Sequence, residues 1–318
     1  MRIPILACNV FRAGAVLLAA ATIVCAQPAP SQNFDKVQIQ VVPVQRNIYM
    51  LSGAGGNITL QIGTEGVLIV DTEFAPLVPK ILVEIRKLSQ GHIRYIINTH
   101  VHGDHVGGNE ALAKSIPISN QEPLNIIAHA NVLNRLTAPG AATPNGETLA
   151  AGLPYDEYET PNKSLHFNGE AVVIYHEPKA HTDGDSIVLF RGSDVISTGD
   201  IFSPEGYPRI DLATGGTVQG ELAALNHLLE LTVPGNQQEG GTYLIPGHGR
   251  ICDDADLVEY RDMVAIITDR VQDLIKKGRN LEQVKAAKPT EDYDTQYGTQ
   301  PGASDRFVEA VYRSLGGK

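Results

Sequence analysis

The chain has 318 residues, of which 42% are hydrophobic and 19% charged, a composition typical of a globular protein with one large or two modest domains. Its formal net charge of −11 argues against nucleic acid as a partner or substrate, because an acidic surface repels phosphate backbones. The 31 glycines and 19 prolines indicate many turns between short strands rather than a helical bundle.

The N-terminus is typical of a secretory signal peptide. Arg2 and Arg12 precede the apolar run of residues 13–26, and no acidic residue occurs before Asp35. The run ends in the small-residue sequence Val-Cys-Ala and is short for a membrane-spanning helix. We therefore predict a signal peptide over residues 1–26. The alternative is an uncleaved membrane anchor or a buried N-terminal helix.

Cleavage after Ala26 would produce an exported protein, periplasmic or secreted, with no stable membrane insertion. Cys252 would be its only cysteine, so no intramolecular disulfide could stabilise the fold. Loss of two arginines would take the formal charge from −11 to about −13. We expect residues 27–40 to be a linker and residues 41–318 to form one domain.

The first half of that domain alternates strands with helices. The expected elements are two strands over 58–72, a helix over 76–91, a strand over 93–99, a helix from 108 and a strand over 125–130. In such α/β sheets, ligands bind at the ends of strands. Residues 137–162 follow, rich in Gly, Pro and polar groups, and we interpret them as a lid or binding loop.

The second half repeats this style. We expect strands over 171–176, 186–190, 194–200 and 242–248, and helices over 218–231, 256–278 and 304–315, the last capped by Ser304. The acidic segment 290–305 is interpreted as a solvated connector within a C-terminal helical extension of about 255–318, with packing near the cleft as the alternative. The pattern favours two similar α/β halves, with a sheet-on-sheet core and helices outside.

Residues 98–105, "NTHVHGDH", place three histidines and an aspartate directly after an apolar strand. His100 and His102 project to the same side of an extended segment, and a turn at Gly103 directs Asp104 and His105 toward a second position. Imidazole and carboxylate are the usual ligands of zinc. One loop can thus contribute to two metals about 3.5–4 Å apart, the spacing of binuclear hydrolases.

Further ligands must come from other strand ends. The candidates are His181 in "KAHTDGDS", Asp200 in "STGDIF" and His248 in "IPGHG", each flanked by glycine or small residues. Any one of them alone has a structural or capping explanation. Together with residues 98–105 they form an ordered set that predicts a two-metal site.

The series H-x-H-x-D-H, "HT", "GD" and "PGHG" resembles that of the metallo-β-lactamase superfamily, from about residue 41 to residue 248. The resemblance implies an αββα four-layer sandwich and a site that holds two Zn²⁺ ions, with iron or manganese as alternatives. It implies that the first metal is held by His100, His102 and His181. It also implies that the second metal is held by Asp104, His105 and His248, and that Asp200 bridges both.

The resemblance also implies supporting and catalytic roles. Asp71 in "VLIVDT" matches the family's first motif, which supports the metal loop, and Thr182 belongs to the "HT" motif. Two metals would share a water and present hydroxide to a carbonyl, with Asp104 and Asp200 as the catalytic carboxylates. Cys252 is expected to be a small buried hydrophobic residue.

Departures from the family patterns narrow the range of candidate substrates. Asp200 stands where well-known β-lactamases carry Cys or Ser, and is similar to glyoxalase II and the lactonases. Ser203 replaces a lysine that binds the substrate carboxylate, which leaves Arg209 as the nearest cation; His129 is a further substrate-binding candidate. The chain is therefore interpreted as an exported binuclear hydrolase that opens a small ester, lactone or β-lactam by metal-bound hydroxide.

Two alternatives stay open, namely a mononuclear iron oxidoreductase acting on persulfides and a thioesterase of the glyoxalase II type. The sequence also leaves the native metal and the oligomeric state open.

Overall fold

The computed structural model describes residues 33–116, 123–139, 150–237 and 240–317. The expected signal peptide and residues 27–32 of the expected linker lie outside the described residues. Residues 34–318 form one compact unit. It begins with a short 3₁₀ helix, η1 (Phe34–Lys36), inside the segment expected to be linker, and with strand β1 at Gln40.

The first sheet has seven strands in chain order. They are β1 (Gln40–Gln45), β2 (Ile48–Ser52), β3 (Ile58–Gly63), β4 (Gly66–Val70), β5 (Ile93–Ile97), β6 (Asn125–His129) and β7 (Asp156–Tyr158). The pairings from β1 to β4 are antiparallel, and those from β4 to β7 are parallel. The parallel half therefore brings several carboxyl ends to one edge.

The second sheet has five strands in the order β12-β11-β10-β9-β8. They are β8 (Asn162–Phe167), β9 (Glu170–Glu177), β10 (Asp185–Phe190), β11 (Val195–Gly199) and β12 (Tyr243–Pro246). The β11–β12 pairing is parallel and the other pairings are antiparallel. The carboxyl ends of β11 and β12 therefore lie together.

The two sheets pack face to face, and strand β4 shows how the sequence divides its side chains between two layers. Leu68 and Val70 join the cluster between the sheets, whereas Val67 and Ile69 join the cluster under the first helical layer. Successive side chains of a strand point to opposite faces, so a continuous apolar run indicates burial on both faces. All four of these side chains are fully buried.

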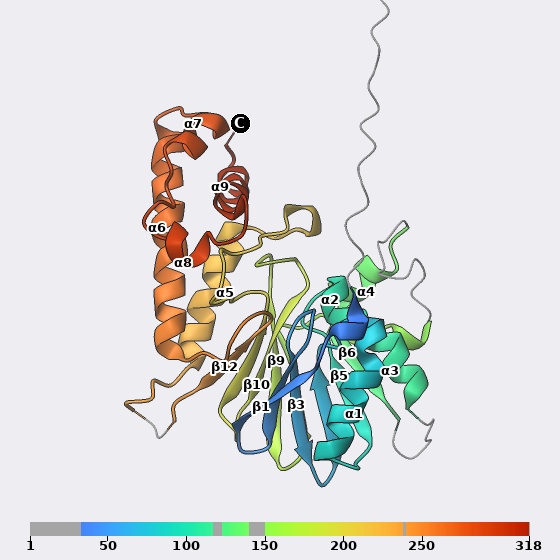
Figure 1. The fold of residues 1–318 in the computed structure, drawn as a ribbon. Helices are drawn as coiled ribbons and strands as arrows, with labels where there is room; N and C mark the ends of the chain where they lie inside the picture. Colours follow the sequence, from blue (N-terminus) through green and yellow to red (C-terminus); the bar gives the residue numbers. More distant parts are fainter. Residues whose placement is uncertain (1–32, 117–122, 140–149, 238–239, 318) are drawn as a thin grey trace, which may run out of the picture. The chain divides into compact units, whose positions relative to one another are not determined.

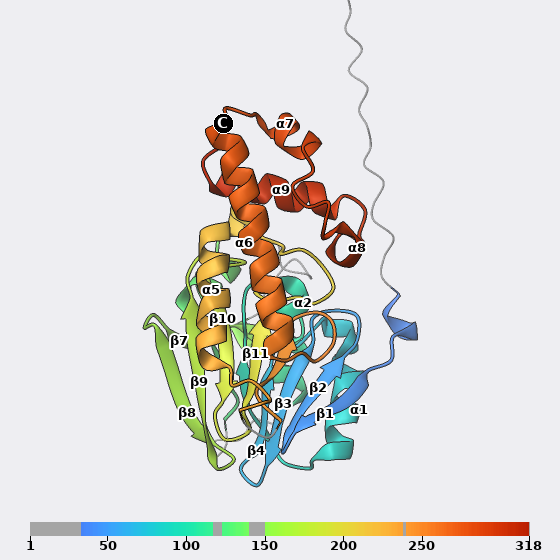
Figure 2. The same ribbon diagram turned by 90° about the vertical axis from the view of Figure 1, so that its left-hand side faces the viewer.

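Helices cover both outer faces (Figure 1). On the first sheet lie α1 (Val78–Leu88), preceded by η2 (Ala75–Leu77), and α3 (Asn109–Ser115). On the second lie α5 (Val218–Leu231) and α6 (Asp254–Lys276), followed by α7 (Leu281–Ala286), α8 (Asp294–Tyr297) and α9 (Ala303–Ser314). Figure 2 shows α5 and α6 side by side, with α7, α8 and α9 gathered near one end of α6. The expected four-layer αββα fold is confirmed.

The C-terminal segment 290–305 differs from its expected role as a solvated connector. It contains α8, and Tyr297 is only 2% exposed because it packs into the cluster formed by α6 and α9. Ser304 does not cap α9; Gly302 holds the N-cap position, and Ser304 Oγ donates to Asp294 Oδ1. Acidic composition predicted solvent exposure here, but the interspersed tyrosines determine the packing.

The described part of 137–162 also contains regular structure, namely η3 (Ala150–Gly152) and strand β7. Two further short helices, α2 (Gly103–Val106) and α4 (Ala130–Leu136), follow β5 and β6. None of the described helices is long and apolar enough to cross a membrane.

Candidate metal centre

Loops from both sheets meet at the edge where the parallel strands end. Residues 98–105 follow β5, His181 lies between β9 and β10, Asp200 follows β11 and His248 follows β12. Their side chains form two groups in which the possible ligand atoms lie within 4.8 Å of one another. The first group is His100, His102, His181 and Asp200, and the second is Asp104, His105 and His248.

In the first group, His181 Nε2 lies 2.9 Å from His102 Nδ1. Asp200 Oδ2 lies 3.9 Å from His100 Nε2 and 3.7 Å from His181 Nε2. His100 and His181 are almost fully buried. Three imidazole nitrogens and one carboxylate oxygen thus face a common point.

In the second group, Asp104 Oδ2 lies 3.3 Å from His248 Nε2 and 3.9 Å from His105 Nε2. The other oxygen of Asp200, Oδ1, lies 3.1 Å from His105 Nε2 and 3.5 Å from His248 Nε2. Asp200 therefore presents one oxygen to each group, the arrangement that a bridging ligand requires.

The donor set fits cations. Within the described residues, several buried atoms that face one another in this centre have no hydrogen-bond partner: His100 Nε2, His105 Nε2, His248 Nε2 and Asp200 Oδ1. Buried polar atoms without partners are costly, and a shared cation would satisfy all of them. Imidazole and carboxylate donors suit zinc, and also iron or manganese.

Burial sets the protonation of the first group. Desolvation, assisted by the charge on His105, lowers the pKa of His100 well below its usual value, and desolvation lowers that of His181 to about 4. Although burial opposes ionisation of Asp200, the nearby positive charge of His105 holds the pKa of Asp200 well below its usual value. Neutral imidazoles and an ionised carboxylate are the forms that bind metal.

The second group carries protons that a cation would replace. Burial disfavours charge on His105, but Asp200 and Asp71 raise its pKa well above the usual value. In the same way, the nearby carboxylates of Asp104 and Asp200 outweigh burial and raise the pKa of His248 to about 9. Burial opposes ionisation of Asp104, but the nearby His248 outweighs it and lowers the pKa of Asp104 to about 2.

Asp71 supports this centre from the end of β4. Its Oδ1 accepts the backbone N–H of Thr99 at 2.8 Å, and its Oδ2 accepts Thr99 Oγ1 and His105 Nδ1, both at 2.7 Å. With Nδ1 committed to Asp71, Nε2 of His105 is left for a metal. Asp71 has φ +61°, a left-handed conformation that turns the chain out of the strand.

His102 has a similar partner that sequence reasoning missed. Its Nε2 lies 3.0 Å from Asp211 Oδ2, and its Nδ1 faces the first group. Asp211 also caps η4 (Leu212–Thr214) through Oδ1, and its backbone N–H donates to His181 O. An isolated acidic residue 109 positions from His102 carries no sequence signal of this contact.

Thr182 and Asp185 shape the turn that carries His181. The backbone N–H of Thr182 donates to Asp185 Oδ2 at 2.7 Å, and Thr182 Oγ1 donates to Asp185 Oδ1 at 2.6 Å. Burial raises the pKa of Asp185 to about 7 against these bonds. This pairing explains why Thr182 and Asp185 occur together in the "HTDGDS" turn. Asp185 was not among the residues predicted from the sequence.

A glycine-rich loop between β2 and β3, residues 53–57 ("GAGGN"), packs against the second group. A Cβ added at Gly56 would overlap the His105 ring, and the Gly56 N–H donates to Asp104 O at 3.0 Å. Glu73 Oε2 accepts the N–H groups of residues 54 and 55, and Asn57 Nδ2 donates to Pro246 O at 2.9 Å. The glycine cluster was the sequence signal that could have identified this loop.

A cavity of about 860 Å³ opens beside the centre. Its lining includes four ligand candidates, the loop of residues 203–211 and one face of α9. Ser203 and Arg209, the two residues suggested from the sequence as substrate-binding in this region, are in this lining. No described residue of 137–162 lines it, and residues 140–149 of the expected lid lie outside the described part of the chain. Among the described residues, helices α8 and α9 contribute to the wall of the cavity.

His129, the third suggested substrate residue, lies outside the lining of this cavity. Its ring stacks on His176 with centroids 3.5 Å apart, and its Nδ1 accepts the N–H of Asn131 at the start of α4. Burial beside His176 lowers the pKa of His129 to about 4. Its contacts in the structure are therefore those of a helix cap.

Comparisons with known proteins agree with this architecture. The model of the metallo-beta-lactamase superfamily matches residues 51–287. A linear primary-alkylsulfatase from a Pseudomonas species is 32% identical over 92 residues, which make up 29% of this chain and 17% of that protein.

Solved structures with the same fold include the inverting sec-alkylsulfatase Pisa1 from a Pseudomonas species, with a TM-score of 0.62 at 16% identity over 87% of this chain and 49% of that one. They also include a metallo-beta-lactamase from Pontibacter korlensis, with a TM-score of 0.57 at 14% identity over 72% of this chain and 99% of that one. The chain thus spans about half of the alkylsulfatase structure and 17% of the curated relative. At these identities, the structural similarity shows the fold alone.

Proposed function

The chain belongs to the metallo-β-lactamase superfamily, and from this premise we propose that it is a binuclear metal-dependent hydrolase of small esters, lactones or β-lactams. The observation that carries the proposal is the pair of donor groups, each facing one oxygen of Asp200. A pair of cations held at such a spacing is the arrangement that activates water for hydrolysis.

His100, His102 and His181 would hold one ion, and Asp104, His105 and His248 the other, with Asp200 between them. Bound zinc ions would lower the pKa of a shared water toward neutrality and polarise the oxygen of the substrate. Asp104 is ionised beside His248 and is the carboxylate best placed to accept a proton during turnover. Ser203 and Arg209, in the cavity lining, would orient polar groups of the substrate.

The cavity volume suits a small molecule rather than a polymer. The formal charge of −11 likewise disfavours nucleic acid. Sulfate esters are a second candidate class, because similarity to alkylsulfatases occurs both in sequence and in fold. We also propose export, with cleavage after Ala26; mass spectrometry of the protein from a bacterial host's periplasm or medium should give Gln27 as the N-terminal residue.

The central test is metal content together with a substrate panel. The protein, loaded with zinc, iron or manganese in separate samples, is assayed with nitrocefin, a lactone, a thioester, a carboxylic ester and an alkyl sulfate. We expect two ions per chain and hydrolysis that a chelator abolishes. Asp200→Ala should lower the stoichiometry and remove activity, whereas Asp262→Asn, at an exposed position on α6, should change neither.

Binding of a single iron ion, with oxygen consumption on a persulfide and no hydrolysis, would instead establish the oxidoreductase alternative. Hydrolysis of the thioester alone would assign the chain to the thioesterase alternative.

A further inference from the structure

One wall of the cavity is formed by a face of α9, a helix that is far in sequence from the histidine motif of residues 98–105. The lining includes residues 303, 306, 307 and 310 of this helix. The spacing i, i+3, i+4, i+7 places these positions on a single helical face. Two of them, Ala303 and Ala310, are small, and this leaves room between the helix and the donor groups.

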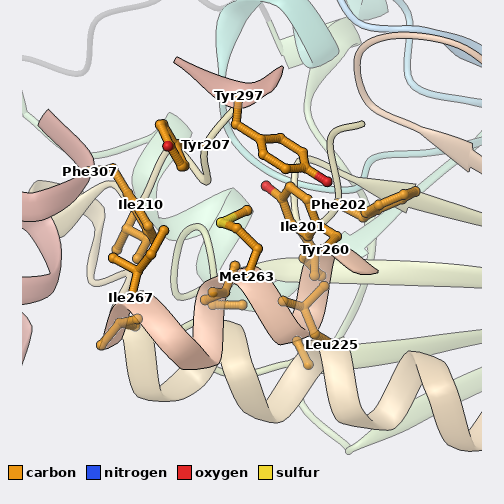
Figure 3. Close-up of a cluster of buried hydrophobic side chains, with 14 of the residues drawn as sticks. Ile201, Phe202, Tyr207, Ile210, Leu225, Tyr260, Met263, Ile267, Tyr297 and Phe307 are labelled. Atoms are coloured by element: carbon orange, nitrogen blue, oxygen red, sulfur yellow. The ribbon is translucent and has the colours of Figure 1, made fainter. Parts of the chain in front are cut away.

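The wall between these alanines carries the aromatic ring of Phe307 beside the exposed Arg306. Phe307 stacks on Tyr207 with centroids 5.2 Å apart and an interplanar angle of 9°, and Tyr297 lies 5.9 Å from Tyr207. Figure 3 shows these three rings above Met263 and Ile267 of α6. With Ile210, these three aromatic residues both line the cavity and belong to the core cluster. The cavity therefore opens onto a fixed part of the hydrophobic core.

Asp294 ties this wall to the loop that follows Asp200. Its Oδ1 accepts Tyr207 Oη at 2.8 Å and Ser304 Oγ at 2.6 Å, so one carboxylate joins the loop of residues 203–211 to α9. Tyr207 Oη also lies 3.2 Å from Thr290 O. The wall is thus held in place by tertiary hydrogen bonds.

We propose that this face of α9 binds the apolar acyl or alkyl chain of the substrate while the reacting bond lies at the two donor groups. This inference rests on the proposed hydrolase function and specifies its substrate class as esters with a medium-length apolar chain. The cavity reaches from His102, His181, Asp200 and His248 to the apolar side chains of α9, so one molecule can contact both ends. Each methylene that enters an apolar site should raise kcat/KM about three- to fourfold until the space is filled.

The test uses p-nitrophenyl esters from acetate to octanoate with the zinc-loaded protein. We expect kcat/KM to rise with chain length in the wild type. In Ala303→Leu, and independently in Ala310→Leu, the octanoate value should fall at least tenfold while the acetate value stays within twofold. Ala255→Leu is the matched control, at an exposed alanine of α6 outside the cavity lining, and should keep the wild-type profile.

Calorimetric binding of octanoate and acetate to the metal-free protein separates the two proposals. Preferential octanoate binding that is lost in the leucine variants would support the apolar wall even if no ester were hydrolysed, in which case only the proposed function would fail. Hydrolysis that does not depend on chain length, or equal binding of both acids, would overturn the inference. Preference for substrates with a distal carboxylate, lost in Arg306→Gln, would overturn it in favour of an anion site.

Discussion

His102 and His105 each have one ring nitrogen that faces its donor group and one that contacts a carboxylate, and this carboxylate orients the ring. His105 Nδ1 lies 2.7 Å from Asp71, and His102 Nε2 lies 3.0 Å from Asp211. A carboxylate partner of this kind fixes the tautomer and increases the basicity of the ligating nitrogen. The structure thus provides one such partner for each donor group, of which only Asp71 was predicted.

Replacement of Asp211 with Asn tests this orientation. The amide oxygen can still accept from the N–H groups of residues 213 and 214, but an amide nitrogen in place of Oδ2 cannot accept the proton of His102. We expect affinity for the first metal to fall about 10- to 100-fold, measured by competition with a chromophoric chelator. Asp262→Asn is the control, and equal metal affinity in the two variants would contradict this role of Asp211.

Gly56 is the second residue whose replacement has a defined consequence. Its Cα lies so close to the His105 ring that the Cβ of alanine would displace the imidazole. Gly56→Ala should therefore reduce the bound metal from two ions to one per chain, measured by elemental analysis. Gly235→Ala should bind two ions, because the nearest atom that an added Cβ there meets among the described residues is 3.9 Å away. Full metal occupancy in Gly56→Ala would contradict this prediction, because it would mean that the loop of residues 53–57 shifts to accommodate the added Cβ.

The strand ends carry the candidate metal ligands, and the helices hold those strands in place. Between α5 and β9, His227 Nδ1 lies 2.6 Å from Glu177 Oε1, and Glu177 is only 5% exposed. This hydrogen bond raises the pKa of His227, although burial lowers it. The pair thus fixes α5 against the strand that leads to His181.

The stability of this contact should depend on pH in a defined direction. Because the folded-state pKa of His227 is raised, its contribution is complete below the unfolded value of about 6.5 and is lost as pH rises through the folded value. His227→Gln should lower the free energy of unfolding by about 1 kcal/mol at pH 6 and by much less at pH 9. Urea unfolding at both pH values measures this, with His166→Gln, at an exposed histidine, as the control. A pH-independent loss would exclude the charged pair.

For the whole molecule, folding brings seven titratable candidate ligands from both sheets into one partly buried centre. The unpartnered atoms of His100, His105, His248 and Asp200 reduce stability unless cations are bound. Because cations bind the folded chain far better than the unfolded one, their binding free energy adds to folding stability.

Removal of metal should therefore destabilise the protein. With free zinc at about 100 times Kd, binding contributes about 2.7 kcal/mol per site, so we expect a chelator to lower Tm by about 5–10 °C. Differential scanning calorimetry with and without chelator measures this shift. The Asp200→Ala variant should show a smaller shift than the wild type. An unchanged wild-type Tm on chelation would mean that the centre does not bind metal in the folded chain.

Sequence patterns alone predicted several elements, because such patterns depend on local spacing. Apolar runs indicated the strands β4, β5, β10 and β12, and helical periodicity indicated α1, α5 and α6. The set of candidate ligands was predicted in the same way, since each lies beside a strand end within a short motif. Tertiary structure alone decided which residues support those ligands and which element forms the cavity wall. Asp211, Asp294 and α9 act through contacts between distant segments, which no local pattern encodes. Short motifs thus identify the candidate metal ligands of the centre. The surface that would select the substrate forms only when the C-terminal helices pack.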